Sequence, residues 1–308
     1  MDPVRIDVII PVYKPGENFA GLIMRLKKQS LPVSRIIIMN TVDAGGGQDV
    51  HSLAAGDPLI SVYDLPKSEF DHGGTRDRAA RLSDADYLLF MTQDAMPKDT
   101  RLVERLYEAF SNGCVKAAYA RQLPRKNCRE IERYTRDFNY PAQSRVKTAA
   151  DLETLGIKTY FCSNVCAMYE RRTYLKLGGF IKKTIFNEDM IFAGGLIKAG
   201  YAIAYAADAR VIHSHNYTGL QQFHRNFDLA VSQADHPEVF AGVRSEGEGA
   251  KLVAQTARHC LDIRKPWLIV SLVYYSACKY AGYLLGKHYT VIPRRVRLMF
   301  TMNKGYWE

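Results

Sequence analysis

Short apolar runs alternate with amphipathic segments through most of the first 213 residues, and this alternation constrains the fold more than any other feature. Apolar residues recur with helical spacing in residues 18–28, 72–82, 99–110 and 187–200. Strands that alternate with helices form parallel sheets that are covered on both faces. The sequence therefore predicts an α/β fold with a mainly parallel sheet. The apolar runs typical of its buried strands occupy residues 7–13, 35–40, 60–63, 87–91, 115–120 and 201–213, and regular structure is also expected over residues 160–169.

Three segments fall outside this pattern. Residues 42–48 are glycine-rich and predict a loop. Residues 121–159 are polar and predict an irregular excursion over a binding site, part of it mobile. After about residue 219 the pattern becomes helical. We therefore expect an α/β domain over residues 1–219 and a helical extension over residues 220–308.

Residues 266–285 are apolar over nearly twenty positions, which is the length of a membrane-spanning helix. Lys279 interrupts this stretch, and an interfacial helix or a buried packing helix tolerates a lysine better than a spanning helix does. We favour these two alternatives over a spanning helix.

The formal net charge of +10 predicts an anionic partner, such as a membrane surface, a phosphorylated substrate or a nucleic acid. Residues 279–297 carry five basic residues and no acidic one, and apolar residues at helical spacing lie among them. This interleaving suits an anionic lipid surface better than a nucleic-acid duplex. A basic helix packed on the protein's own core remains the alternative.

The N-terminus and the cysteines indicate a reducing compartment. The apolar run over residues 6–12 is too short for a signal peptide and lacks a cleavage site. The six cysteines contain no C-x-x-C pair, so we expect reduced thiols in a cytoplasmic protein.

Polar groups follow the ends of several predicted strands. Pro11-Val12-Tyr13, Asn40-Thr41 and Thr92-Gln93-Asp94 occupy three such ends. Each group alone could be a loop that caps a strand. Because ligands bind at the carboxyl ends of parallel strands, the three groups together predict one cleft.

Candidate metal ligands occupy two strand ends. Asp94 follows an apolar strand, and a carboxylate there together with substrate phosphates suits Mg²⁺ or Mn²⁺. His213 and His215 follow another strand, and their spacing places both imidazoles on one side. One histidine could complete the metal site while the other meets a phosphate, or both could be surface residues.

Two further groups begin predicted helices. Asn187-Glu188-Asp189 offers more acceptors than helix capping requires, so one of the acids is a candidate general base. Gly73-Gly74 permits a close backbone approach to an anion, with Arg76 positioned for a phosphate or a nucleobase. The spacing differs from that of dinucleotide-binding and ATP-binding loops.

Taken in order, these residues resemble the family 2 inverting glycosyltransferases, which have the GT-A fold. The similarity is greater to their bacterial rhamnosyltransferase branch, which builds cell-wall polysaccharides and O-antigens. It covers nearly the whole chain. The matching pieces are VIIPVYK at 8–14, FDHGGTRDRA at 70–79, FMTQDAMP at 90–97, NEDM at 187–190, HSHNYT at 213–218 and QQFHRNFD at 221–228.

The resemblance implies a role for each matching residue. Asp189, beside Glu188, corresponds to the general base. Asp94 corresponds to the last aspartate of a metal-binding D-x-D motif whose first acid is replaced here, so His213 or His215 would complete a Mg²⁺ or Mn²⁺ site. Asn40 stands where many members have an aspartate that faces the nucleobase. The residues that would bind the nucleotide sugar are Pro11, Val12, Tyr13, Asn40, Thr41, Gly73, Arg76, Gln93 and Asp94.

The resemblance also implies a function and its partners. A nucleotide-diphosphate sugar donor, dTDP-rhamnose, would give L-rhamnose to a hydroxyl of a polyprenyl-diphosphate-linked saccharide, and a single displacement would invert the configuration. The chain would then act as a peripheral protein on the inner face of the cell membrane, with residues 220–308 on the membrane and acceptor side. We expect no nucleic-acid partner, and a homo-oligomer is left open.

Two other classes of protein share some of these features. A nucleotidyltransferase that acts on sugar phosphates is also α/β, with strand-end aspartates and Mg²⁺, but usually carries a basic glycine-rich loop after its first strand. The segment PVYKPGENF has a single lysine in that place. A non-catalytic protein that binds anionic surfaces is the second class. It would account for the net charge of +10 but not for the ordered polar groups at the strand ends.

Overall fold

The computed structural model describes residues 3–43, 49–243 and 246–307, and it confirms the α/β fold. Its sheet has the strand order β3-β2-β1-β4-β8-β6-β9-β5, and β7 pairs with the outer side of β9. The strands are β1 (Ile6–Tyr13), β2 (Arg35–Val42), β3 (Ile60–Pro66), β4 (Tyr87–Met91), β5 (Met96–Pro97), β6 (Val115–Leu123), β7 (Arg145–Lys147), β8 (Cys166–Glu170) and β9 (Ala202–Ile212).

Most of the strand pairs are parallel, as the alternation of strands and helices predicts. Strands β1 to β4 pair in parallel, and so do β6 and β9. Strand β8 is antiparallel to both β4 and β6, between which it lies. This insertion joins the two parallel halves into one sheet.

Helices cover both faces of the sheet. Successive side chains of β1 point to opposite faces, and each face packs into its own hydrophobic cluster. Ile6, Val8 and Ile10 pack with side chains of α1 and α4, whereas Ile9 packs with side chains of α3 and α8. The helices of the α/β part are α1 (Asn18–Lys27), α2 (Val50–Ala54), α3 (His72–Leu82), α4 (Leu102–Glu108), α5 (Glu130–Asn139), α6 (Leu152–Leu155), α7 (Arg171–Lys176) and α8 (Glu188–Lys198).

One expectation for the middle of the chain is wrong. The segment 121–159 is not an irregular excursion, because it carries the end of β6, all of α5 and the short strand β7. Helix α5 buries no residue fully, and its apolar residues Ile131, Tyr134 and Phe138, although at helical spacing, stand among charged residues. The regular structure expected over 160–169 is β8, which follows a short helical turn. Of the predicted loop 42–48, residues 44–48 lie outside the described residues.

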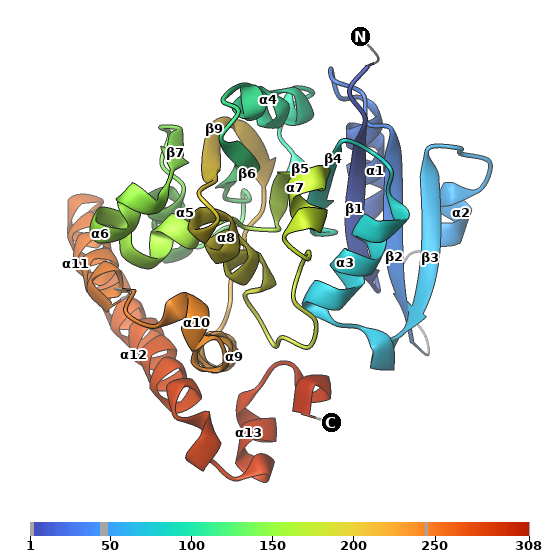
Figure 1. The fold of residues 1–308 in the computed structure, drawn as a ribbon. Coiled ribbons are helices and arrows are strands. Elements are labelled where there is room, and N and C mark those ends of the chain that lie inside the picture. Colours follow the sequence, from blue (N-terminus) through green and yellow to red (C-terminus); the bar gives the residue numbers. More distant parts are fainter. Residues whose placement is uncertain (1–2, 44–48, 244–245, 308) are drawn as a thin grey trace.

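The C-terminal part is helical, as expected. Helix α12 packs along α9, with glycines at the contact, because a Cβ at Gly282 or Gly286 would collide with the carbonyl oxygen of Phe223 or Phe227. Figure 1 places α12 at the periphery of the molecule, on the side away from β3. The helices of this part are α9 (Gly219–Asp235), α10 (Pro237–Phe240), α11 (Glu246–Asp262), α12 (Leu268–Lys287) and α13 (Arg294–Phe300).

After α13 the chain returns to the segment that precedes α8. Phe227 and Val231 of α9 bury Ile185 in a third hydrophobic cluster, which the C-terminal aromatic residues Tyr306 and Trp307 complete. The C-terminal part therefore supports the loop that leads into Glu188 and Asp189.

Candidate active site

A cavity of about 410 Å³ lies where β4, β6 and β9 end and β8 begins, and helices α3, α5, α8, α9 and α12 contribute to its wall. It contains the predicted acids and both predicted histidines. Glu188, Asp189 and the histidines lie more than a hundred residues from Arg76 in the sequence, and the fold brings them together. The predicted site residues that line it are Arg76, Asp94, Glu188, Asp189, His213 and His215.

Neither acid at the start of α8 acts mainly as a helix cap. Glu188 is buried, and its Oε1 lies 3.2 Å from an Arg76 guanidinium nitrogen and accepts a hydrogen bond of 3.2 Å from the Asn164 side chain. Asp189 accepts hydrogen bonds from the backbone N–H groups of Asn164 and Met190, at 3.1 and 2.8 Å. The two carboxylates are thus held side by side with different partners.

These partners move the two pKa values in opposite directions. Burial raises the pKa of Asp189 to about 7, and the negative charge of Glu188 adds to the rise. Burial also raises the pKa of Glu188, but the charges of Arg76 and His72 and the Asn164 hydrogen bond outweigh burial, so the net shift is downward. Glu188 therefore stays ionised, while Asp189 is able to exchange a proton near neutral pH.

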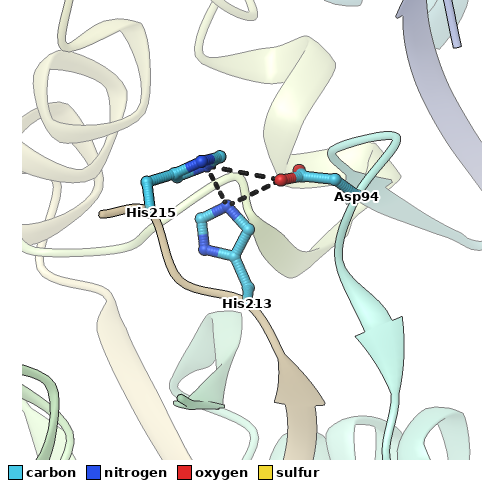
Figure 2. Close-up of side chains that lie close together, drawn as sticks. All are labelled: Asp94, His213 and His215. Carbon is cyan, nitrogen blue, oxygen red and sulfur yellow. Dashed lines mark hydrogen bonds and ion pairs between the residues drawn. The ribbon is translucent and has the colours of Figure 1, made fainter. Parts of the chain in front are cut away.

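Asp94 and the two histidines converge, as Figure 2 shows. The Asp94 carboxylate lies 3.5 Å from Nε2 of His213 and 3.3 Å from Nε2 of His215, and the two Nε2 atoms are 3.0 Å apart. Strand β9 ends at Ile212, so the histidines follow the strand and still face one side. Arg125 forms an ion pair of 3.1 Å with the same Asp94 oxygen, Oδ2.

Gln122 determines which His213 nitrogen carries the proton. The Oε1 atom of Gln122 accepts from the Arg136 guanidinium, and Nδ1 of His213 lies 3.0 Å from the same oxygen. Because a carbonyl oxygen only accepts, Nδ1 must donate its proton there, and Nε2 keeps its lone pair toward Asp94. The Gln122 amide nitrogen is in turn fixed by Tyr140 and Ser163.

The Asp94–His213–His215 cluster meets the requirements of a divalent metal site. Its ligand atoms all lie within 4.8 Å of one another. Burial lowers the pKa of both histidines, for His213 to about 3 even though Asp94 opposes the shift, so both imidazoles are neutral at pH 7. Neutral imidazoles and a carboxylate are metal ligands, and the contact with Gln122 orients one of them.

The predicted residues at the ends of β1 and β2 form a second group, which does not line this cavity. The Gln93 side chain exchanges two hydrogen bonds with the Tyr13 backbone, at 2.8 and 3.1 Å. Asn40 donates a hydrogen bond of 2.8 Å to Asp64, which the sequence did not single out. The side chains of Val12 and Thr41 are buried, and Pro11 is half-buried.

Gly73 serves helix packing. A Cβ at this position would collide with the backbone carbonyl oxygen of Ile181 and would touch Glu188. The glycine therefore lets the first turn of α3 approach the segment that leads into α8, which brings Arg76 to Glu188.

Comparisons with known proteins agree with this geometry. The model of the family described as "Glycosyl transferase family 2" matches residues 7–178, more than half of the chain. The chain belongs to glycosyl transferase family 2. It is 38% identical to the O-antigen chain rhamnosyltransferase RfbN of Salmonella typhimurium, over 99% of this chain and 96% of RfbN. It is 36% identical to the O-antigen chain rhamnosyltransferase WbaN of Salmonella anatum, over 98% and 95% of the two chains.

Solved structures confirm the GT-A fold of this glycosyltransferase. A mannosyltransferase from Pyrobaculum calidifontis, solved with GDP-Man and Mn²⁺, superimposes with a TM-score of 0.57 at 15% identity, over 98% of this chain and 84% of that one. S. aureus TarS 1–349 superimposes with a TM-score of 0.55 at 13% identity, over 93% and 91% of the two chains.

Several residues that orient the side chains of this cavity were not identified from the sequence. Asn164 orients both acids, and Gln122 and Arg125 orient His213 and Asp94. Gln122 and Arg125 lie in the polar segment that was expected to be irregular. Only the extent of β6 could have indicated them, because β6 runs parallel to β9 and must end near His213.

We predict that Gln122→Leu lowers Mn²⁺ affinity about 10- to 100-fold, because His213 is then free to turn its lone pair away. Titration of free Mn²⁺ by electron paramagnetic resonance measures this affinity without any turnover. Ser163→Ala is the matched control, since it removes only one contact to the Gln122 amide nitrogen. Equal Mn²⁺ affinity in the wild type and Gln122→Leu would show that Gln122 does not orient a metal ligand.

Proposed function

We propose that this glycosyltransferase moves L-rhamnose from dTDP-rhamnose to a hydroxyl of a polyprenyl-diphosphate-linked saccharide, with inversion of configuration. The observation that carries the proposal is one cavity that holds a proton-accepting carboxylate and a metal-ligand cluster. The choice of rhamnose and of O-antigen synthesis rests on the two relatives, which align over nearly their full length.

Asp189 is the proposed general base, with Glu188 as its neighbour of fixed charge. Two backbone N–H groups aim the Asp189 carboxylate, and its raised pKa lets it take the proton of the acceptor hydroxyl as that oxygen attacks the anomeric carbon. The charge of Glu188 is already balanced by Arg76. Glu188 therefore stays ionised. Its negative charge helps to keep the pKa of Asp189 raised, and Glu188 does not compete with Asp189 for the proton.

Asp94, His213 and His215 would hold the divalent cation. The bound cation would supply positive charge to the departing nucleoside diphosphate. Two imidazoles and one carboxylate suit Mn²⁺ better than Mg²⁺, because Mg²⁺ prefers oxygen ligands.

The strand-end group would bind the nucleoside. Backbone atoms of Pro11, Val12 and Thr41 and the side chain of Tyr13 would line its pocket. Asn40 would face the nucleobase together with Asp64, to which it is hydrogen-bonded. Gln93 belongs to this proposed set through its two hydrogen bonds to the Tyr13 backbone. Gly73 lies apart from it, against Ile181 and Glu188, and would act only by bringing Arg76 to the site.

Arg76 remains a candidate ligand of the nucleotide portion. It lines the cavity, and its buried Nε has no hydrogen-bond partner among the described residues. A phosphate or a sugar hydroxyl at this atom would satisfy it.

The donor is tested with a panel of nucleotide sugars and added Mn²⁺. We expect dTDP-rhamnose to be hydrolysed or transferred faster than UDP-glucose, UDP-GlcNAc and GDP-mannose, with release of dTDP measured by chromatography. Removal of Mn²⁺ by a chelator should suppress the reaction. Clear turnover of a UDP-hexose without turnover of dTDP-rhamnose would overturn the rhamnosyl assignment.

The base is tested by pH. Because the carboxylate form of Asp189 is the reactive one and its pKa is raised to about 7, kcat/KM should rise between about pH 6 and 8 and then level off. Asp189→Asn should lower transfer about 100-fold or more and leave donor binding near normal. Asp208→Asn, an exposed acid on β9, is the control. Transfer retained by Asp189→Asn would remove Asp189 from this role.

We also propose that α12 attaches the protein to the inner face of the membrane as a peripheral helix. It is the one helix among the described residues that is long and apolar enough to cross a membrane, with a mean hydropathy of 1.3. Its outer stripe is apolar, and the exposed fractions of Val270 and Val273 are 75% and 59%. Its inner side packs on α9, so a position in the membrane surface fits better than a spanning one.

Charge favours a lipid surface over a second copy of the chain. Residues 263–307 contain no acidic residue, and exposed basic residues flank α12 at Arg264, Lys265, Lys287 and Arg294. Two copies paired through this stripe would bring like charges together, whereas the anionic lipids of the inner leaflet attract them.

The membrane proposal predicts that the double variant Val270→Asp/Val273→Asp binds phosphatidylglycerol-containing vesicles at least about tenfold more weakly than the wild type in flotation assays. Met24→Asp, which changes an exposed apolar residue of α1, should bind as the wild type does. Unchanged flotation of the double variant would exclude this stripe as the membrane contact.

A further inference from the structure

Two cations in the cavity wall have no anionic partner. Lys279 is the only charged residue in positions 266–286, and it points from α12 into the cavity. Arg225 of α9 lines the same cavity. The structure gives neither side chain a hydrogen bond or ion pair with any residue it describes. Both side chains are half-buried, and cations that are withdrawn from water are normally paired, so this pair indicates a missing anion.

Arg225 is held by aromatic rings. Its guanidinium lies 4.6 Å from the centre of the Phe186 ring and 5.7 Å from that of Tyr217. Ring faces attract the cation and leave its N–H donors available at the edge. Such a guanidinium is positioned to bind an anion that enters the cavity.

The carboxylates nearby are already in use. Glu132 forms an ion pair of 2.6 Å with Arg136, and Asp94 and Glu188 are paired with Arg125 and Arg76. Burial lowers the pKa of Lys279, and Arg225 and Arg136 lower it further against the opposing charge of Glu132. The α9–α12 side of the cavity therefore carries excess positive charge, which a phosphate group would neutralise.

A second cavity begins at this point. This side cavity, of about 260 Å³, lies between α5, α9 and the first half of α12. Lys279, His215, Tyr217, Gln222 and Glu132 line both cavities, so the two meet there. A ligand with its anionic group at Lys279 could thus reach from the Asp189 side into the side cavity.

The side cavity has a lining suited to a saccharide or a lipid head group. Thr135 and Ser271 offer hydroxyl groups, and Tyr275 offers an aromatic ring. Leu268 lies at the same wall, near the start of the α12 stripe that we propose to contact lipid.

We propose that Arg225 and Lys279 form an anion subsite that receives a phosphate of the acceptor, at the junction of the catalytic and side cavities. The proposal rests on the glycosyl transfer to a lipid-linked saccharide proposed above. The donor diphosphate carries the same chemistry, so the experiment has to separate the two sources.

Binding is measured by calorimetry with three probes, so that it does not depend on turnover. The first is a panel of octyl diphosphates that carry a single glucose, galactose or mannose. The second is the matching octyl hexosides, which lack phosphate. The third is dTDP-rhamnose with Mn²⁺. The variants are Lys279→Met, Lys279→Arg and Arg225→Gln, and Lys251→Met, an exposed lysine of α11, is the control.

We expect Lys279→Met and Arg225→Gln to weaken binding of the phosphate-bearing probes about 10- to 100-fold. Binding of the octyl hexosides and of dTDP-rhamnose should stay within about twofold. Lys279→Arg, which keeps the charge, should remain close to the wild type, and so should Lys251→Met. If a thermal melt shows that Lys279→Met is not folded, the three probes are compared for Arg225→Gln alone, with the same expected result.

Two results would overturn the subsite. Equal weakening for the donor and for the phosphate-bearing probes would assign the cations to the donor diphosphate. Unchanged affinity for the phosphate-bearing probes would leave Lys279 and Arg225 without a phosphate-binding role. Failure of the proposed function appears separately, as a wild type that does not turn over dTDP-rhamnose in the donor panel.

Discussion

The buried ion pair between Arg76 and Glu188 is the contact on which the arrangement of the active site depends. It joins α3, which follows the N-terminal strands, to the first turn of α8, which begins more than a hundred residues later. Gly73 makes the approach of the two helices possible, and Asn164 completes the partners of Glu188. Because Arg76 pairs with Glu188, the structure gives the neighbouring Asp189 no ion pair among the described residues, and burial together with the charge of Glu188 raises its pKa.

The sequence was sufficient for the parts of the molecule that repeat a regular pattern. Apolar runs separated by amphipathic helices predict the parallel strands correctly, because burial on both faces of a sheet leaves a clear signature. Helix α5 has a weaker one, because Ile131, Tyr134 and Phe138 recur at helical spacing but stay half-buried, and its side toward the polar cavity carries Glu132 and Arg136. The many charged residues of 121–159 explain why this segment was expected to be irregular.

The site was predictable where chemistry is carried by unusual residues in unusual places. Asp94 and the two histidines stood out as polar groups at the ends of apolar strands, and the structure brings them together. Gln122 and Asn164 did not stand out, because an amide that orients another side chain has no sequence signature of its own. Their role depends on the pairing of β6 with β9 and of β8 with β4, which is a property of the fold.

The glycine contacts between α9 and α12 have a mechanical consequence. At Gly282 and Gly286 no side chain separates the two backbones, so the helices form a stiff unit that cannot slide or tilt independently. One side of this unit presents the apolar stripe, and the other carries Gln222 and Arg225 into the cavity. A displacement of α12 at a lipid surface would therefore displace α9 with it, and so would move the cavity wall that Gln222 and Arg225 form.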